Sequence, residues 1–542
     1  MSHLSGKKDG QRQRILLPCP KSACYSVGVK HFAENKPTFQ ILPEQELLRP
    51  ALPKVLGCVD YLHLERELKR MDQIILTSGI ESLFVALSKE RYEAQARENG
   101  TKPSAKALHR HQLSSRQALR CTILKQLLDH PFRELSVHLA ESALMQWFCR
   151  IENFGEVRVP SKSTLQVYGQ WLEDEQMKMI LAQLKEAASG TALDGSSVIG
   201  LANALELDVV WVDSTALPAH IHMPVDWVLL RDGARTLVKA IVLIRKHGLK
   251  HRMPEPLEFL SLMNQLCIAM SATRRRTDCK KQRKAVLRQM KRLIKVITEH
   301  AERYHRVLDE NWAQTDWSRP QAEQVLRRIA GVLEQMPAAV KQAHERIIGE
   351  RKVSSKEKIL SLYEPDIHVI VRGKAGAEVE FGNSLFVAEQ SDGYILDHDL
   401  RQDVAPGDAK WLEERLSKIA EDGDPTNLSG LFADRGFASK RNEEILAEHG
   451  IFNGLCPRNP KKLEERLGEE EFGAGQKRRA QIEPRIAILK NVYLSEGCPR
   501  AKGFVNRQLA VDWAVLTHNL RLLARLPLAE PVAAEIAESA AA

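Results

Sequence analysis

The chain has 542 residues, of which 43% are hydrophobic and 27% charged, a composition typical of soluble globular proteins. No apolar run approaches the roughly 18 residues that a membrane helix needs, and the basic N-terminus lacks a signal-peptide core, so we expect a cytoplasmic protein with no membrane partner. The formal charge of +9 favours polyanionic partners, and the length allows about three or four domains.

The first part of the chain is predicted to be a polar arm followed by helices. Residues 1–40 are basic and polar, which predicts a disordered arm. Residues 41–190 carry apolar side chains at helical spacing, such as Leu119, Ile123 and Leu127. We therefore expect an α-helical N-terminal region.

One helical pair within this region has the spacing of a DNA-binding motif. The first helix stops at Asp129-His130-Pro131, and a second follows over residues 132–142. A helix, a tight turn and a helix form a helix-turn-helix DNA reader, and an ordinary helical hairpin has the same spacing. Both interpretations stay open on the sequence, with the N-terminal region as the candidate DNA-binding part.

The chain changes character at about residue 205. Residues 205–232 contain a buried strand rich in Val and Trp, residues 233–355 have the pattern of long helices, and strands alternating with helices return in residues 356–526. This alternation predicts a mixed sheet covered by helices. We expect an α/β core interrupted by a large all-α insertion, with a flexible tail at 527–542.

Three acidic residues stand out within the α/β part. Asp213 and Asp434 each end an apolar run that we interpret as a strand, and Glu483 is expected to cap a helix that begins at Pro484. Two carboxylates at strand ends and a third on a helix can meet at one edge of a sheet and hold a pair of divalent cations. Taken singly, each acid also has a structural explanation: a turn cap, a turn pair with Arg435, or a helix cap.

The most basic stretch of the chain follows the predicted insertion's first helices. Eleven positive charges lie between residues 274 and 295, opposed only by Asp278. An apolar stripe in the same segment predicts an amphipathic helix with a cationic face, which either contacts phosphates or is simply solvated. The candidate DNA-binding residues in this stretch are Arg274, Arg275, Arg276, Lys280, Lys281, Arg283 and Lys284.

Two other clusters resemble metal sites but are interpreted differently. His220 and His222 alternate on one side of an extended segment, yet hard cations such as Mg²⁺ prefer oxygen ligands. Asp397, His398 and Asp399 are expected on the solvent side of a strand or at its end. The nine cysteines contain no CxxC pair, which favours buried free thiols over structural zinc.

Several segments together resemble DDE transposases of bacterial insertion sequences, most closely the group filed as ISNCY. The clearest are Val212-Asp213-Ser214-Thr215 and Ala433-Asp434-Arg435-Gly436-Phe437. Further segments that carry the likeness are residues 221–226, 230–233, 364–366, 372–374, 379–383 and 482–490. The likeness covers roughly residues 110–525. Arg479, Glu483 and Lys490 also match the spacing of a Tyr-x₂-Arg-x₃-Glu-x₆-Lys signature, with Gln476 in place of its tyrosine.

The resemblance implies an RNase H-like catalytic core with Asp213, Asp434 and Glu483 as catalytic metal ligands. It implies two Mg²⁺ ions, with Mn²⁺ as a substitute, and cleavage of the element's ends followed by strand transfer into target DNA. Arg435, Arg479 and Lys490 would contact DNA. The expected partners are terminal inverted repeats, target DNA and further copies of the chain, in a bacterial cytoplasm and on the nucleoid when DNA is bound.

Two other functions are compatible with the same residues. One is a metal-dependent nuclease that cuts DNA without joining it. The other is a catalytically silent derivative that only binds DNA. Intact acids at all three positions favour an enzyme over the silent derivative.

Overall fold

The computed structural model describes residues 52–151, 157–192, 195–273, 279–374, 377–421, 428–495, 497 and 499–529. The predicted arm at 1–40, most of the predicted tail and the three arginines Arg274, Arg275 and Arg276 lie outside these ranges. The described chain divides into two compact units. The larger unit takes in the residues up to 230, residues 270–287 and the residues from 335 onwards, and the smaller takes in 231–269 and 288–334.

The larger unit begins with a group of helices. These are α1 (Val59–Thr77), α2 (Ile80–Glu98), α3 (Ala105–Leu128), α4 (Phe132–Glu141), α5 (Ala143–Cys149), α6 (Lys162–Tyr168) and α7 (Asp174–Ser189). The Ser104 hydroxyl accepts the Ala107 N–H and so caps the start of α3. Asp129, with a left-handed φ of 47°, ends α3 and turns the chain into α4.

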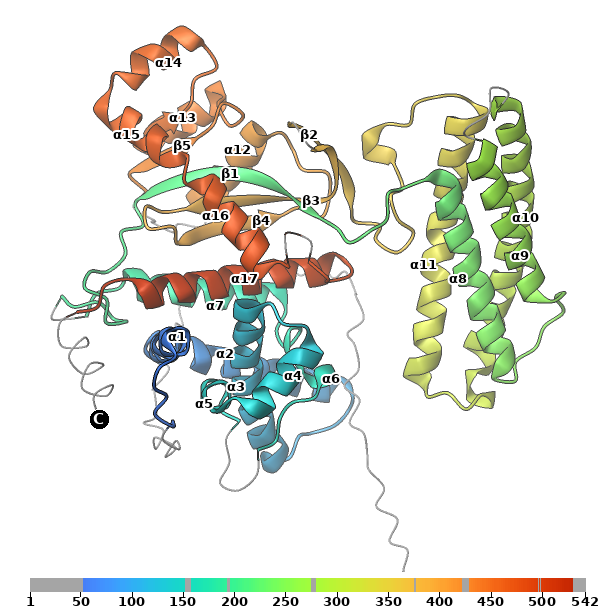
Figure 1. The fold of residues 1–542 in the computed structure, drawn as a ribbon, viewed down its shortest axis with the longest axis horizontal. Helices are drawn as coiled ribbons and strands as arrows, with labels where there is room; N and C mark the ends of the chain where they lie inside the picture. The colour runs from blue at the N-terminus through green and yellow to red at the C-terminus, as the bar shows by residue number, and fades with distance from the viewer. Residues whose placement is uncertain are drawn as a thin grey trace, which may run out of the picture. The chain divides into compact units, whose positions relative to one another are not determined.

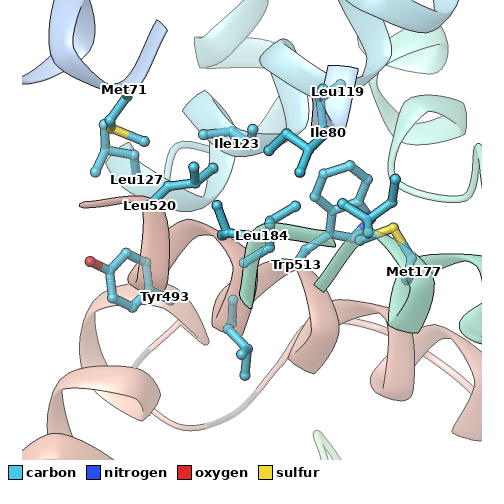
Figure 2. Close-up of a cluster of buried hydrophobic side chains, with 14 of the residues drawn as sticks. Met71, Ile80, Leu119, Ile123, Leu127, Met177, Leu184, Tyr493, Trp513 and Leu520 are labelled. Atoms are coloured by element: carbon cyan, nitrogen blue, oxygen red, sulfur yellow. The ribbon is translucent and has the colours of Figure 1, made fainter. Parts of the chain in front are cut away.

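The C-terminal helix α17 (Phe504–Arg525) completes the packing of this helical group. Figure 2 shows Trp513 and Leu520 of α17 among buried side chains from the N-terminal helices, including Ile123 and Leu184. Trp513 and Leu520 are almost fully buried. Burial of this apolar surface joins the two ends of the described chain into one core.

A six-stranded mixed sheet forms the other part of the larger unit. Its strands are β1 (Val209–Pro218), β2 (His368–Lys374), β3 (Ala377–Glu389), β4 (Ile395–Leu400), β5 (Gly430–Ala433) and β6 (Phe452–Leu455). The order is β2-β3-β1-β5-β6, and β4 pairs with β3. β1 is antiparallel to β3 and parallel to β5, and β5 is parallel to β6. β1 therefore lies at the centre of the sheet.

Helices cover both faces of the sheet. One face packs against α12 (Asp408–Glu421) and α13 (Lys440–Glu448), through residues such as Val210 and Val212. The opposite face contributes Trp211 and Leu217 to the core shared with the helical group. Figure 1 shows α17 lying along this second face, between the sheet and the N-terminal helices. The remaining helices are α14 (Pro460–Leu467), α15 (Glu470–Arg479) and α16 (Ile482–Ile488), which continues as a π-helical turn over Leu489–Tyr493.

The expectation that Asp397, His398 and Asp399 face solvent is wrong. These β4 residues are only partly exposed, because α17 packs against the strand and side chains of α12 bond to Asp397 and Asp399. Their partners are Arg415 for Asp397, Asp512 of α17 for His398, and Trp411 for Asp399.

The smaller unit is formed by four helices side by side (Figure 1). They belong to α8 (Asp226–Lys246), α9 (Pro256–Ala272), α10 (Cys279–Asn311) and α11 (Arg319–Ala343). Apolar residues at helical spacing are fully buried on each, for example Ile241, Met263 and Ile297. The Tyr304 hydroxyl on α10 donates to the His251 carbonyl at 2.9 Å and accepts the His251 N–H, which secures the segment before α9.

Among the described residues, no single helix combines the length and apolar composition needed to cross a membrane. Helices α1 and α2 meet that requirement only as a pair bent by 62°.

Candidate active site

The site is built around a row of residues that runs across the sheet. Glu389 of β3, Trp211 of β1, Phe432 of β5 and Gly454 of β6 are successive cross-strand partners. The Trp211 and Phe432 rings stack, with centroids 5.4 Å apart and planes 13° apart. Because side chains alternate across a strand, residues two positions further along β1 and β5 are expected on the same face as this row.

Helix α15 crosses this row at close range. The Trp211 indole donates to the Gly475 carbonyl at 2.9 Å. A Cβ on Gly475 would lie 2.0 Å from the Phe432 ring, and one on Gly454 would lie 2.3 Å from it. Only glycine allows this approach of backbone to ring. The Arg478 guanidinium then lies over Trp211, 4.8 Å from the ring centroid.

Glu389 ties α15 and α16 to the sheet. Its side chain is fully buried, and its two carboxylate oxygens accept from Arg478 at 2.9 Å and from Arg485 at 3.1 Å. Burial raises the pKa of Glu389, although both guanidiniums oppose the rise. Arg478 and Arg485 flank Arg479 and Glu483 in sequence, so this ion pair network fixes the segment that carries both.

Asp213 lies inside β1 rather than at its end, as the sequence had suggested. β1 continues to Pro218 because its antiparallel partner β3 runs on beside it, whereas the parallel pairing with β5 stops at Trp211. Asp434 directly follows β5. Asp213 Oδ1 accepts the Ser214 N–H at 2.7 Å, and Asp434 Oδ1 accepts the Gly436 N–H at 2.7 Å. Both carboxylates are thus held by the backbone.

Glu483 also differs in detail from its predicted position. Helix α16 begins two residues earlier than predicted, at Ile482, with Gln481 as the capping residue. Glu483 therefore lies in the first turn, and Pro484 is accommodated there because first-turn N–H groups have no helical partner. A carboxylate in a first turn is stabilised by the helix dipole.

The predicted acids interact with one another through their charges. The pKa of Asp213 is raised to about 6: burial is the largest cause, the Asp434 and Glu483 carboxylates also raise it, and the Ser214 N–H and Arg479 lower it. The four predicted residues Asp213, Asp434, Glu483 and Arg479 are therefore close enough to interact through their charges. An aspartate crowded in this way gains from a bound cation.

A fourth acid, Asp408, belongs to the same edge of the sheet and was not predicted. The Ser214 hydroxyl donates to Asp408 Oδ1 at 2.8 Å. Burial raises the pKa of Asp408, and the Asp434 carboxylate raises it as well. A Cβ on Gly436 would lie 2.8 Å from Asp408 Oδ2 and 3.0 Å from Asp434 Oδ1, so both carboxylates face that glycine. In the sequence, Asp408 is recognisable only as an acid at the start of a helix, which is too common a feature to indicate a functional site.

Asp213, Asp408 and Asp434 open onto a cavity of about 470 Å³, whereas the exposed Glu483 is not among its lining residues. Its lining includes Asp213, Ser214, His368, Asp403, Asp408 and Asp434. Carboxylate oxygens are the donors that Mg²⁺ prefers, so the donor chemistry suits a hard cation. Within the described ranges, however, no three His, Cys, Asp or Glu side chains are grouped closely enough to hold a metal ion as they stand. A cation site here would need the acids to move closer together.

The residues next to the acids have protein partners. Lys490 donates to the Ala216 carbonyl of β1 at 2.8 Å, which fastens the end of α16 to the central strand. Gln476 donates to the carbonyls of Gly454 at 2.6 Å and Ala433 at 3.2 Å, and so bridges β5 and β6 where the signature has tyrosine. Arg435 is exposed beside Asp434.

The basic helix α10 has two different faces at its start. Lys280 and Lys284 both pair with Glu350, at 3.0 and 2.8 Å, and Arg283 lies 5.2 Å over the Trp227 ring. Lys281 is exposed. Exposed cations continue along the helix at Arg288, Arg292 and Lys295. These positions recur at helical spacing, so they form one stripe, which we call the α10 stripe: Lys281, Arg288, Arg292 and Lys295.

The predicted helix-turn-helix pair corresponds to α3 and α4. The exposed charged residues of α4 are Arg133, Glu134 and Glu141, so its outer face is not basic. DNA readers of this type place cations at the phosphates beside the recognition helix. The ordinary helical hairpin is therefore the simpler description of this pair.

Comparisons with models of protein families, with curated proteins and with solved structures give no match to this chain.

Proposed function

We propose that this protein is a DDE-type transposase that cuts the ends of an insertion sequence and joins them to target DNA. The single observation that carries the proposal is that Asp213 and Asp434, far apart in sequence, follow the paired parts of two adjacent strands, with Glu483 near enough to raise the pKa of Asp213. The sheet is mixed and covered by helices, and in the sequence a helical unit lies between its central strand and the other strands. Both features support an RNase H-like core with an insertion.

The proposed chemistry is metal-assisted phosphodiester cleavage. Bound divalent cations would polarise the scissile phosphate and lower the pKa of the attacking water. Asp213, Asp434 and Glu483 would hold these ions through their carboxylate oxygens. Each of the two aspartates accepts one backbone N–H through Oδ1, which orients its carboxylate, although the acids would still have to move closer together to share a cation. Arg479, which already interacts with Asp213, and exposed Arg435 would neutralise phosphate charge.

DNA is the proposed partner because the chain is basic and concentrates cations on α10. The α10 stripe would contact the phosphate backbone without reading its sequence. The N-terminal helices would recognise the terminal repeats, and pairing two ends would require further copies of the chain.

The test is a cleavage assay on DNA that carries the sequences flanking the coding region on both sides. Native protein should nick this DNA at a discrete position with Mg²⁺ or Mn²⁺ and not with a chelator present. Asp213→Asn and Asp434→Asn should abolish nicking and retain DNA binding. Asp208→Asn, at the other end of the same strand with a side chain bonded to Ser429, is the matched control and should cut normally.

Two outcomes would favour the other functions. A pre-cut end that the native protein never joins to a second DNA would indicate a nuclease without strand transfer. Binding without any metal-dependent nicking would indicate a silent DNA-binding derivative. Nicking that survives Asp213→Asn would contradict the assigned active site.

A further inference from the structure

A second cavity of about 500 Å³ lies in the larger unit, away from the acids just described. It is bounded by the end of α3, the turn into α4, the end of α6 and the segment that leads into α17. Volumes of this size are typical of small-ligand sites.

The cavity contains an ammonium group with weak partners. Lys125 of α3 is about one-fifth exposed, and its Nζ lies 3.8 Å from Asp129 Oδ1 and 3.4 Å from Gln126 Oε1. A charge-assisted hydrogen bond is typically about 2.7–2.9 Å long, so both contacts are loose. Asp129 Oδ1 instead accepts the Ser495 hydroxyl at 2.8 Å. The carboxylate is thus engaged elsewhere.

Other charges make this region electropositive. Arg500 and Lys502 line the cavity with Lys125, whereas Asp129 is the acid among its described lining residues. Burial lowers the pKa of Lys125, Asp129 raises it, and Arg500 lowers it. A bound anion would relieve this repulsion and give the Lys125 ammonium a short partner.

The rest of the lining suits a flat group with polar edges. Phe132 lies beside the ammonium, with its ring centroid 5.9 Å from Lys125 Nζ. Side-chain amides of Gln166, Gln170 and Asn506 also face the cavity, and Gln170 donates to Asn506 at 2.6 Å. An aromatic ring next to amide donors and acceptors is a surface on which a nucleobase stacks and hydrogen-bonds.

We propose that this cavity binds a nucleotide, with its phosphate at Lys125, Arg500 and Lys502 and its base against Phe132. The nucleotide comes either from the free pool or from the 5′-phosphorylated end of a DNA strand, since both present the same chemistry. This site does not depend on the acidic site, because no residue is shared between the two cavities.

The test measures binding to the full chain by calorimetry, using adenosine 5′-monophosphate, adenosine, and a trinucleotide with and without a 5′-phosphate. We expect the phosphorylated compounds to bind and the unphosphorylated ones to bind at least about tenfold more weakly. Stronger binding of the mononucleotide than of the trinucleotide indicates the free pool, and the reverse order indicates a strand end.

Variants tie the binding to this cavity. Lys125→Met, which keeps the length of the side chain, and Arg500→Gln, at an exposed position that leaves the core intact, should each weaken phosphate-dependent binding about tenfold. Arg97→Gln, an exposed arginine on α2, is the matched control and should bind as the native protein does. The Asp213→Asn variant should bind these nucleotides as the native protein does. Nucleotide binding can therefore be tested even if the proposed catalytic function is wrong. Undetectable binding to native protein, or unchanged affinity in both cavity variants, would overturn the proposal.

Discussion

Asp213 and Asp434 each lie two residues beyond the last pair, Trp211 and Phe432, of two adjacent parallel strands. Val209 pairs with Gly430, an offset of 221 positions, and Asp434 follows Asp213 by the same 221. Continued two residues further at the usual strand spacing of about 4.8 Å, this register would bring the two aspartates side by side, which agrees with the effect of Asp434 on the pKa of Asp213. Two ionised carboxylates at that spacing repel each other unless a proton or a cation lies between them.

This crowding predicts that Asp213→Asn stabilises the protein when divalent cations are absent. The pKa of Asp213 is raised from 3.8 to about 6, chiefly by burial and in part by the neighbouring acids. A carboxyl with a higher pKa in the folded chain lowers the free energy of unfolding as pH rises from about 4 to 6, and the loss persists above pH 6. Urea unfolding should show a gain of about 1–2 kcal/mol at pH 7.5 and almost none at pH 4.

Adding Mg²⁺ supplies the control for this prediction. If the acids bind a cation, Mg²⁺ should raise the melting temperature of the native protein more than that of Asp213→Asn. Equal free energies of unfolding for the two proteins at pH 7.5 without metal would show that the Asp213 carboxylate does not destabilise the folded chain.

Glu389→Gln should weaken the attachment of α15 and α16 to the sheet. The change keeps the size of the side chain but removes the charge that holds Arg478 and Arg485 in a buried site. We expect a loss of about 2–4 kcal/mol in the free energy of unfolding, since one partner of a buried ion pair is removed. Glu414→Gln, which breaks the more exposed pair with Arg401, should lose less than about 1 kcal/mol.

Two helical glycines should respond in opposite directions to alanine. Gly475→Ala places a methyl group 2.0 Å from the Phe432 ring and should destabilise the protein by about 2 kcal/mol or more. Gly331→Ala in α11 meets nothing within 4 Å and should stabilise its helix by about 0.5–1 kcal/mol. Adding Phe432→Leu to Gly475→Ala should recover part of the loss, and no recovery would argue against the clash.

Replacing the four cations of the α10 stripe by glutamine should weaken non-specific DNA binding and reduce its dependence on salt. Each lost phosphate contact lowers the slope of log affinity against log salt by about 0.9, as measured by fluorescence anisotropy. Lys280→Gln with Lys284→Gln is the comparison, because Glu350 already pairs with both lysines. A larger loss of DNA affinity in the Lys280 and Lys284 variant than in the stripe variant would show that DNA does not bind along the α10 stripe.

The sequence predicted the coarse architecture better than its connections. A strand was expected within residues 205–232 and strands alternating with helices within 356–526, and β1 lies in the first range and β2 to β6 in the second. The mixed sheet with separate helical regions is confirmed at that level. Hydrophobic periodicity is a local signal, so it survives without knowledge of the fold.

Contacts between distant segments could not be predicted. The Glu389 network and the Ser214–Asp408 bond join residues about 90 to 190 positions apart, and no spacing rule connects them. The same holds for Lys280 and Glu350, 70 positions apart, which changes the expected role of a basic residue. Asp213 was expected at a strand end because the antiparallel partner that prolongs β1 lies far along the chain.

The central position of β1 has a consequence for synthesis on the ribosome. Its first partner in the sheet, β3, begins 168 positions after β1 in the sequence. At about 5–20 residues per second, roughly 8–34 seconds pass between the synthesis of the two strands. During that interval the Val-Val-Trp-Val segment has no strand to pair with, so its apolar side chains depend on the N-terminal helices or on a chaperone for cover.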